Sequence, residues 1–171
     1  MRAVARIAGV CILGWMVLGV CASSQAPASK LARKEPVMTR HAEGSFDVKT
    51  TPVAGNDATN GTAIGRYALE KQFHGDLEGT SKGEMLGAGD PAKGSAGYVA
   101  IEQVTGTLEG HSGAFALQHM GTMNQGKFEL NVVVVPGTGT GELVGIEGKM
   151  TIIIAGGKHS YKFEYTLPAA Q

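Results

Sequence analysis

Apolar and polar residues alternate along most of this chain, and that alternation limits what the chain can fold into. Residues 161–168, YKFEYTLP, place three aromatic rings and a leucine at every second position. Alternate side chains of a β-strand point to the same face, so one face of this segment is apolar. No helix-length window carries the i, i+3, i+4, i+7 pattern of an amphipathic helix. The alternation therefore predicts an almost wholly β protein.

A short glycine motif, G-x-L-x-G, occurs at residues 75–79, 106–110 and 141–145, with starts 31 and 35 residues apart. Glycine lets a strand bend sharply and approach its neighbours, as strands do at barrel corners. We expect each motif to form such a corner. The glycine that follows each motif is then expected to form the hairpin turn: Gly83, Gly113 and Gly148. Consecutive hairpins predict a single antiparallel barrel of about eight strands.

The first residues have the three parts of a secretory signal peptide. Arg2 and Arg6 supply positive charge, an apolar stretch covers residues 7–20, and small residues around Ala22 form a cleavage site. Cleavage after Ala22 predicts a periplasmic or extracellular protein. Both cysteines precede that site, so the mature chain is expected to have no disulfide. The apolar stretch also precedes it, so no membrane span is expected in the mature chain.

Two alternatives for the N-terminus stay open. An uncleaved anchor needs about 20 apolar residues, and this stretch is shorter. Acylation of Cys21 is a minority alternative, because Val20 stands where a small residue is expected. The expected organisation is a signal peptide at 1–22, a lead-in at 23–43, a barrel at 44–168 and a tail at 169–171.

Composition excludes one class of partner. The chain has 15 basic and 15 acidic side chains, so its formal net charge is zero. Nucleic-acid binding draws on an excess of basic groups to neutralise phosphates. A nucleic-acid partner is therefore not expected.

Four ordered motifs carry a resemblance to a known family: GSAGYVAIE, GTLEGHSGAFALQH, VVPGTGTGEL and FEYTLP. Together they resemble an uncharacterised bacterial domain-of-unknown-function family with an allene-oxide-cyclase-like β-barrel. The resemblance covers nearly all of residues 44–168 and implies an all-β, eight-stranded, calycin-like barrel. It implies no reaction, and no site residue of allene oxide cyclase can be matched here.

The usual cofactor and nucleophile motifs are absent or incomplete. Residues 136–145, PGTGTGELVG, lack the lysine and the following helix of a phosphate loop. In GHSGA, Ala114 replaces the last glycine of a nucleophile elbow, so Ser112 is expected in a turn. The histidines form no H-E-x-x-H or H-x-H pair, so no metal and no cofactor are expected. His74 is expected in solvent, His111 and His159 in turns, and His119 alone to face inward.

Glu102 is the carboxylate that the alternation directs into the barrel. It is in phase with Tyr98 and Leu108, and Lys71 is in phase with the apolar residues of its own segment. An apolar setting raises the pKa of a carboxyl, which favours acid/base catalysis by Glu102 together with His119. The structural alternative is that Glu102 pairs with Lys71. A single bulge would turn Glu102 outward.

Small barrels hold either packed side chains or one small ligand. The expected lining combines apolar residues with Glu102 and His119 as polar points: Leu77, Tyr98, Phe115, Met120, Leu130 and Tyr165. The ligand contacts are expected from Tyr98, Phe115, Lys71 and Tyr165. Three functions stay open: an exported barrel that binds a small apolar ligand, a cofactor-independent isomerase or cyclase using Glu102, and a structural module that forms oligomers of this chain.

Overall fold

A computed structural model describes residues 38–53 and 64–168. The predicted signal peptide, both cysteines, the predicted tail and the lead-in up to residue 37 lie outside the described residues. Eight strands and two short 3-10 helices make up the described chain: β1 (Thr39–Pro52), β2 (Ile64–Gly75), β3 (Leu77–Asp90), η1 (Pro91–Lys93), β4 (Ser95–Leu108), β5 (His111–Asn124), β6 (Lys127–Val134), η2 (Gly141–Leu143), β7 (Glu147–Ala155) and β8 (Lys158–Thr166). None of the helices found among these residues is long and apolar enough to cross a membrane.

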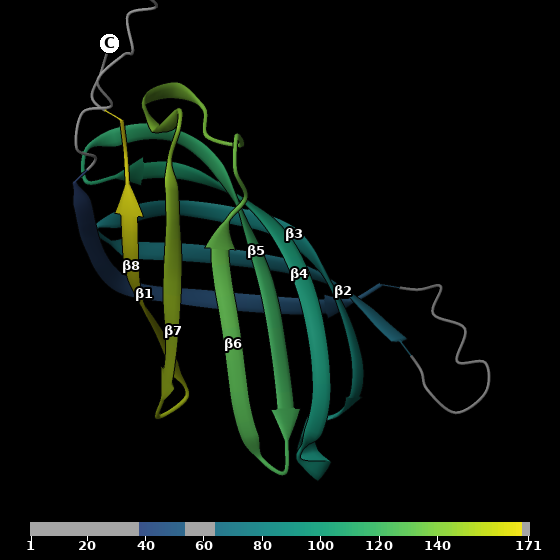
Figure 1. Cartoon of the computed structure of the whole chain (residues 1–171). Coiled ribbons are helices and arrows are strands. Elements are labelled where there is room, and N and C mark those ends of the chain that lie inside the picture. The colour runs from purple at the N-terminus through teal and green to yellow at the C-terminus, as the bar shows by residue number, and fades with distance from the viewer. Residues whose placement is uncertain (1–37, 54–63, 169–171) are drawn as a thin grey trace, which may run out of the picture. The chain divides into compact units, whose positions relative to one another are not determined.

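The strands form one closed antiparallel barrel in chain order, and β8 pairs with β1 to complete it (Figure 1). Each strand hydrogen-bonds to the next along the chain, as a run of hairpins requires. The predicted all-β, eight-stranded antiparallel barrel is therefore confirmed.

The barrel begins earlier than predicted. β1 starts at Thr39, which pairs with Thr166 of β8, so residues 39–43 are strand and not lead-in. The alternation already runs through this segment, since Ala42 is buried and the residues on either side of it are exposed. Its short, mainly polar sequence hid that pattern.

The predicted role of the motif glycines is wrong in detail. The second motif contains the β4–β5 turn itself, where Glu109 and Gly110 have φ of 45° and 86°. Two-residue hairpin loops with positive φ at both positions match the right-handed twist of the flanking strands. The glycine expected to form this turn, Gly113, instead lies within β5. Likewise, Gly83 lies within β3 and Gly148 within β7.

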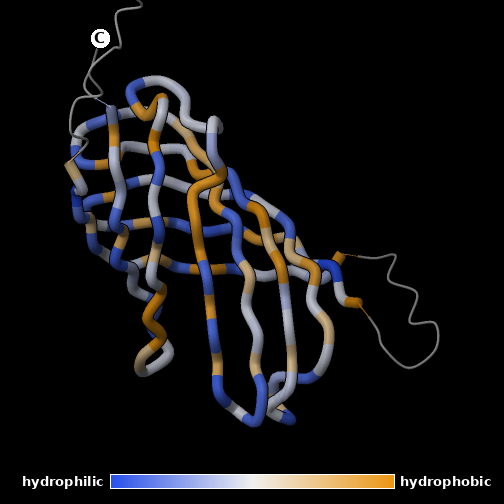
Figure 2. The backbone as a smooth tube through the Cα atoms, in the orientation of Figure 1, coloured by the Kyte–Doolittle hydropathy of each residue, from blue (hydrophilic) through white to orange (hydrophobic). Residues whose placement is uncertain are grey.

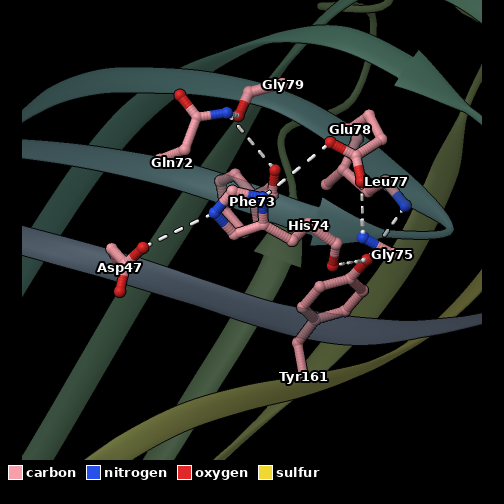
Figure 3. Close-up of polar contacts among 9 residues, drawn as sticks. All are labelled: Asp47, Gln72, Phe73, His74, Gly75, Leu77, Glu78, Gly79 and Tyr161. Atoms are coloured by element: carbon pink, nitrogen blue, oxygen red, sulfur yellow. Dashed lines mark hydrogen bonds and ion pairs between the residues drawn. The ribbon is translucent and has the colours of Figure 1, made fainter.

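One end of the barrel is filled with large apolar side chains. We call it the packed end, and its interior is formed by Phe73, Leu77, Val104, Leu108, Phe115, Leu117, Val134, Met150, Tyr161, Phe163 and Tyr165. The Tyr161 hydroxyl accepts a hydrogen bond from the Leu77 amide at 2.9 Å and so ties β8 to the β2–β3 turn (Figure 3). Nearby on the surface, half-exposed His74 lies 3.5 Å from Asp47 (Figure 3), as expected for a solvated histidine.

The opposite end is looser because β6 and β7 separate. Only Val132 and Val133 of β6 pair with β7, although the rest of each strand is paired on its other side. Figure 1 shows the two strands diverging, and Figure 2 shows apolar residues gathered where β7 ends, at Ile152–Ile154. We call this the open end.

Candidate functional site

A band of four polar side chains crosses the barrel interior between its two ends. Lys71, Ser81, Glu102 and His119 come one each from β2, β3, β4 and β5, and each is buried. All four occupy inward positions of the alternation. β4 pairs with both neighbours in an unbroken register, so no bulge turns Glu102 outward.

The Glu102 carboxylate is the centre of this polar band. Its Oε1 accepts hydrogen bonds from Lys71 Nζ at 2.6 Å and from His119 Nε2 at 2.9 Å. Its Oε2 accepts from the Ser81 hydroxyl at 2.6 Å. The pairing of Glu102 with Lys71, given above as the structural alternative, is therefore confirmed, and His119 lies beside Glu102 as the sequence indicated. Ser81 is a further partner that the sequence did not indicate.

The expected raised pKa of Glu102 is wrong. Burial by itself raises the pKa of this carboxyl. The hydrogen bond from His119, the positive charge of Lys71 and their further interactions outweigh burial and lower the pKa to about 2. The sequence indicated both the burial and the neighbours of Glu102, but the relative size of their opposite effects on its pKa depends on distances that only the structure gives. Glu102 is consequently ionised at neutral pH.

The ionised carboxylate determines which nitrogen of His119 carries hydrogen. A carboxylate only accepts hydrogen bonds, so the Nε2 atom that contacts it is an N–H donor. In the neutral ring, Nδ1 is then the atom with the free lone pair. Glu102 thus holds the His119 ring in one tautomer and one orientation.

Lys71 is held from two sides. Besides its bond to Glu102, its Nζ lies 4.9 Å from the centre of the Phe46 ring and 5.7 Å from that of Phe73. Both distances suit cation–π attraction. The ammonium group is therefore fixed in position at the boundary between the packed and open ends.

A cavity of about 180 Å³ lies in the open end, next to this polar band. Its lining includes Lys71 and His119 but not Glu102, so the carboxylate lies behind the two groups that face the cavity. The rest of the lining is mostly apolar: Phe46, Val48, Thr50, Leu69, Met85, Tyr98, Phe128, Leu130, Ile152, Ile154 and His159.

A second hollow of about 460 Å³ adjoins the cavity, since Met85, Tyr98 and Phe128 line both. It leads along β2–β6 toward the rim of the open end. The Tyr98 ring lies against Gly121, where an added Cβ would come within 2.3 Å of the tyrosine ring. The glycine therefore makes room for Tyr98 between the two hollows.

The predicted lining residues divide between the two ends. Tyr98, Lys71, His119 and Leu130 line the cavity. Leu77, Phe115 and Tyr165 belong to the packed end, where Phe115 and Tyr165 both stack on Phe163. Met120 is 56 % exposed on the outer face, so its predicted inward position is wrong. Neighbouring residues of a strand point oppositely, so an inward His119 requires an outward Met120.

His159 is a cavity residue that sequence reasoning placed in a turn. It lies in β8, lines the cavity, and its ring centre is 5.1 Å from that of Phe46. The signal was present in the sequence, because His159 is in phase with Tyr161 and the aromatic residues that follow. His111, also expected in a turn, is the first residue of β5 and bonds to Arg40.

The packed end has a polar contact of its own. The Tyr165 hydroxyl donates a hydrogen bond to Glu109, and burial followed by this bond raises the pKa of Tyr165 to about 12. No cavity residue is involved. Within residues 38–53 and 64–168, no three His, Cys, Asp or Glu side chains gather as a set of metal ligands.

Comparison with known proteins places this barrel in a family. A family model described as "Protein of unknown function (DUF3224)" matches residues 42–165. A solved structure of a protein with unknown function from the same family, from Shewanella oneidensis MR-1, is 47% identical; the match covers 78% of this chain and 100% of that one, with a TM-score of 0.71. A search of curated proteins found no match. The chain therefore belongs to the DUF3224 family of proteins of unknown function.

Proposed function

We propose that the open end binds a small, mainly apolar, neutral molecule that carries one hydrogen-bond-accepting group. One observation carries the proposal: an apolar cavity of about 180 Å³ whose floor presents a fixed lysine and a fixed histidine. Concave apolar sites with a few oriented polar groups are the usual form of small-molecule sites. The adjoining hollow offers space for the remainder of the molecule.

The charge of the floor favours a neutral ligand. The positive charge of Lys71 is balanced by the negative charge of Glu102, to which it is directly bonded. A carboxylate that entered the cavity would therefore add a buried charge with no partner of opposite sign. A carbonyl or hydroxyl oxygen can accept from the Lys71 ammonium without that cost. The Lys71 ammonium has three N–H donors, and among the described side chains it donates to Glu102.

The other two functions fit the cavity less well. A structural module with a filled barrel leaves the space above Lys71 unexplained. An isomerase that uses Glu102 itself as acid or base needs a carboxyl that contacts substrate and changes protonation near neutral pH. Glu102 lies behind the cavity lining, and its pKa is about 2.

The test uses the full chain with three eight-carbon probes: 2-octanone, 2-octanol and octanoate. Titration calorimetry and amide NMR spectra should show binding of the ketone and the alcohol, with octanoate at least tenfold weaker. The shifted amides should belong to the cavity lining. Absence of saturable binding by both neutral probes would overturn the proposal.

A blocking variant makes the test specific to the cavity. Gly87 lines the hollow next to it, and an added Cβ would make only ordinary contacts of 3.7–3.9 Å. Gly87→Phe should therefore fold and should weaken 2-octanone binding at least tenfold. Leu86→Phe, at the next position on the outward face, is the matched control and should bind as the unaltered chain does. Equal binding by both variants would contradict the site.

We also propose that the protein is exported. The N-terminal sequence supports this, because it has a charged start, an apolar stretch and a cleavage site at Ala22. We expect a mature chain that begins at Ser23 and is recovered outside the cytoplasm. Mass spectrometry of the intact protein from fractionated cells measures its N-terminus. An unprocessed chain in the cytoplasm would contradict export, and a lipid-modified Cys21 would replace release with anchoring.

A further inference from the structure

Lys71 and His119 meet at a single oxygen atom. Lys71 Nζ and His119 Nε2 both donate to Oε1 of Glu102, so their nitrogens lie close together at the cavity floor. Ser81 occupies the other carboxylate oxygen. Lys71 and Ser81 already give both oxygens of Glu102 a hydrogen-bond partner. A purely structural role of Glu102 therefore does not require His119, which also lines the cavity. This shared arrangement places a cation and an imidazole side by side, both lining the same space.

The second nitrogen of His119 is the one left for a ligand. Within the described residues, every fully buried side-chain nitrogen or oxygen has a hydrogen-bond partner. The structure gives His119 one such bond, through Nε2 to Glu102. Nδ1 is therefore not fully buried, and the space that His119 lines is the cavity. With Nε2 as the N–H donor, Nδ1 of the neutral ring has a lone pair available to take up a proton.

A ligand that fits these two groups has an oxygen that accepts from Lys71 and a hydrogen that Nδ1 can remove. A ketone with hydrogen on the carbon next to its carbonyl has both, and it is neutral. We propose that His119 is a general base that moves a proton on such an enolisable ketone, with Lys71 holding the ketone oxygen and Glu102 orienting the His119 ring. This inference rests on the proposed binding function.

The proton transfer needs no other reactant. Nδ1 takes the proton from the carbon next to the carbonyl, and the C–H electron pair becomes the carbon–carbon double bond of an enolate. The carbonyl π electrons move to the oxygen, where the Lys71 ammonium stabilises the negative charge. Nδ1 then delivers a hydrogen, either the one it removed or a solvent hydrogen that has replaced it, to the same carbon. In an unsaturated ketone the hydrogen can instead go to a carbon further along, which shifts the double bond.

Glu102 acts through His119 and is a positioning residue. It stays ionised throughout, because its pKa is about 2, and its bond to Nε2 stabilises the imidazolium that forms when Nδ1 takes a proton. Lys71 has the complementary role. Its ammonium is already oriented by Phe46 and Phe73, so little reorganisation accompanies the charge that develops on the ketone oxygen.

The test follows hydrogen–deuterium exchange on 2-octanone in D₂O with the full chain. Proton NMR measures the loss of the signals from the carbons on either side of the carbonyl, and calorimetry measures binding of the same probe. We expect exchange at least tenfold faster than in matched buffer, with 2-octanol binding as a non-exchanging control. His119→Gln keeps an N–H that can donate to Glu102 but has no base. It should bind the ketone, and the exchange rate should fall to that of matched buffer.

Three further results decide the roles. Exchange by the unaltered chain should rise with pH through one ionisation, and a flat profile would overturn the inference even if His119→Gln failed to fold. Glu102→Gln should shift that pH profile as well as slow exchange, since it removes the charge that stabilises the imidazolium. Lys71→Met should slow exchange more than it weakens 2-octanol binding.

The outcomes separate this inference from the binding function. Saturable ketone binding with exchange at the buffer rate would overturn proton transfer and leave the binding function standing. Full exchange in a folded His119→Gln variant would overturn His119 as the base. If neither the ketone nor the alcohol binds, the binding function is wrong and this inference fails with it.

Discussion

The same eight strands build two unlike ends of one barrel. In the packed end, β8 contributes Tyr161, Phe163 and Tyr165, and each of these residues is only 1 % exposed. In the open end, β6 and β7 separate, and the inner positions of β3 include small residues such as Gly87. The contrast shows that stability and a candidate site can be divided along a barrel axis. Side-chain size at inward positions decides which end is packed and which is open.

The polar band lies at the boundary between these two environments. From below, the rings of Phe46 and Phe73 restrict Lys71. On the side of the open end, Lys71 and His119 line the cavity. A charged cluster at this level can be both desolvated and reachable, which neither the core nor the rim would allow. Three substitutions or conditions test this division, and we order them by expected effect.

The largest effect should come from the packed end. Phe163 is 1 % exposed and stacks on Phe115 and Tyr165, so Phe163→Ala should lower the free energy of unfolding by about 3–5 kcal/mol. Leu130→Ala, which enlarges an existing cavity at the open end, should cost about 1 kcal/mol because Leu130 is only partly buried. Urea unfolding of both variants measures the difference. Equal losses would erase the distinction between the ends.

The polar band should come next. Lys71→Met leaves the buried carboxylate with His119 and Ser81 but without its cation, so we expect a loss of about 3 kcal/mol, at the low end for a broken buried pair. Adding Glu102→Leu removes the stranded charge and should restore at least half of that loss. Chemical unfolding of the single and double variants measures both steps. A double variant no more stable than Lys71→Met would show that the pair is not the source of the loss.

The smallest of the three effects concerns pH. Unfolding returns the Glu102 carboxyl to its ordinary pKa of 4.5 from about 2 in the folded chain. A carboxyl with a lowered folded pKa stabilises the fold above its unfolded pKa, and that stabilisation is lost as pH falls toward the folded value. By pH 3 the loss should reach about 2 kcal/mol relative to neutral pH. Unfolding curves at pH 7 and pH 3 measure it.

Two variants control the pH experiment. Glu102→Gln has no carboxyl to protonate, so this part of the acid sensitivity should vanish. Glu70→Gln makes the same change at an exposed position of β2 and should leave it in place. Identical acid sensitivity in all three chains would show that Glu102 does not cause the loss of stability at low pH. It would also contradict the lowered pKa of Glu102.

The sequence predicted much of this arrangement because β-structure has a simple period. The alternation placed Lys71, Glu102 and His119 on inward faces, and the structure confirms all three positions. It missed Ser81, whose small polar side chain stands among glycines and carries little signal. It also placed Met120 inward against the parity set by His119. Consistent use of the two-residue period would have avoided that error without any tertiary information.

The turns were harder to place because each glycine has more than one use. The same residue type forms a turn at Gly110 and sits within a strand at Gly113. The sequence alone does not separate these uses, because the difference lies in the backbone torsion and in which strand passes nearby. The early start of β1 was missed for a related reason, since its partner in β8 lies at the far end of the chain.

The sequence by itself determined the class of fold, the family, and the inward direction of the residues in the polar band. These follow from local periodicity and from short motifs, which are written in consecutive residues. Only the tertiary structure decided that one end is packed and the other open, that Glu102 has Lys71, Ser81 and His119 as partners, and that its pKa falls instead of rising. Those outcomes depend on distances between residues of different strands, and barrel closure sets those distances.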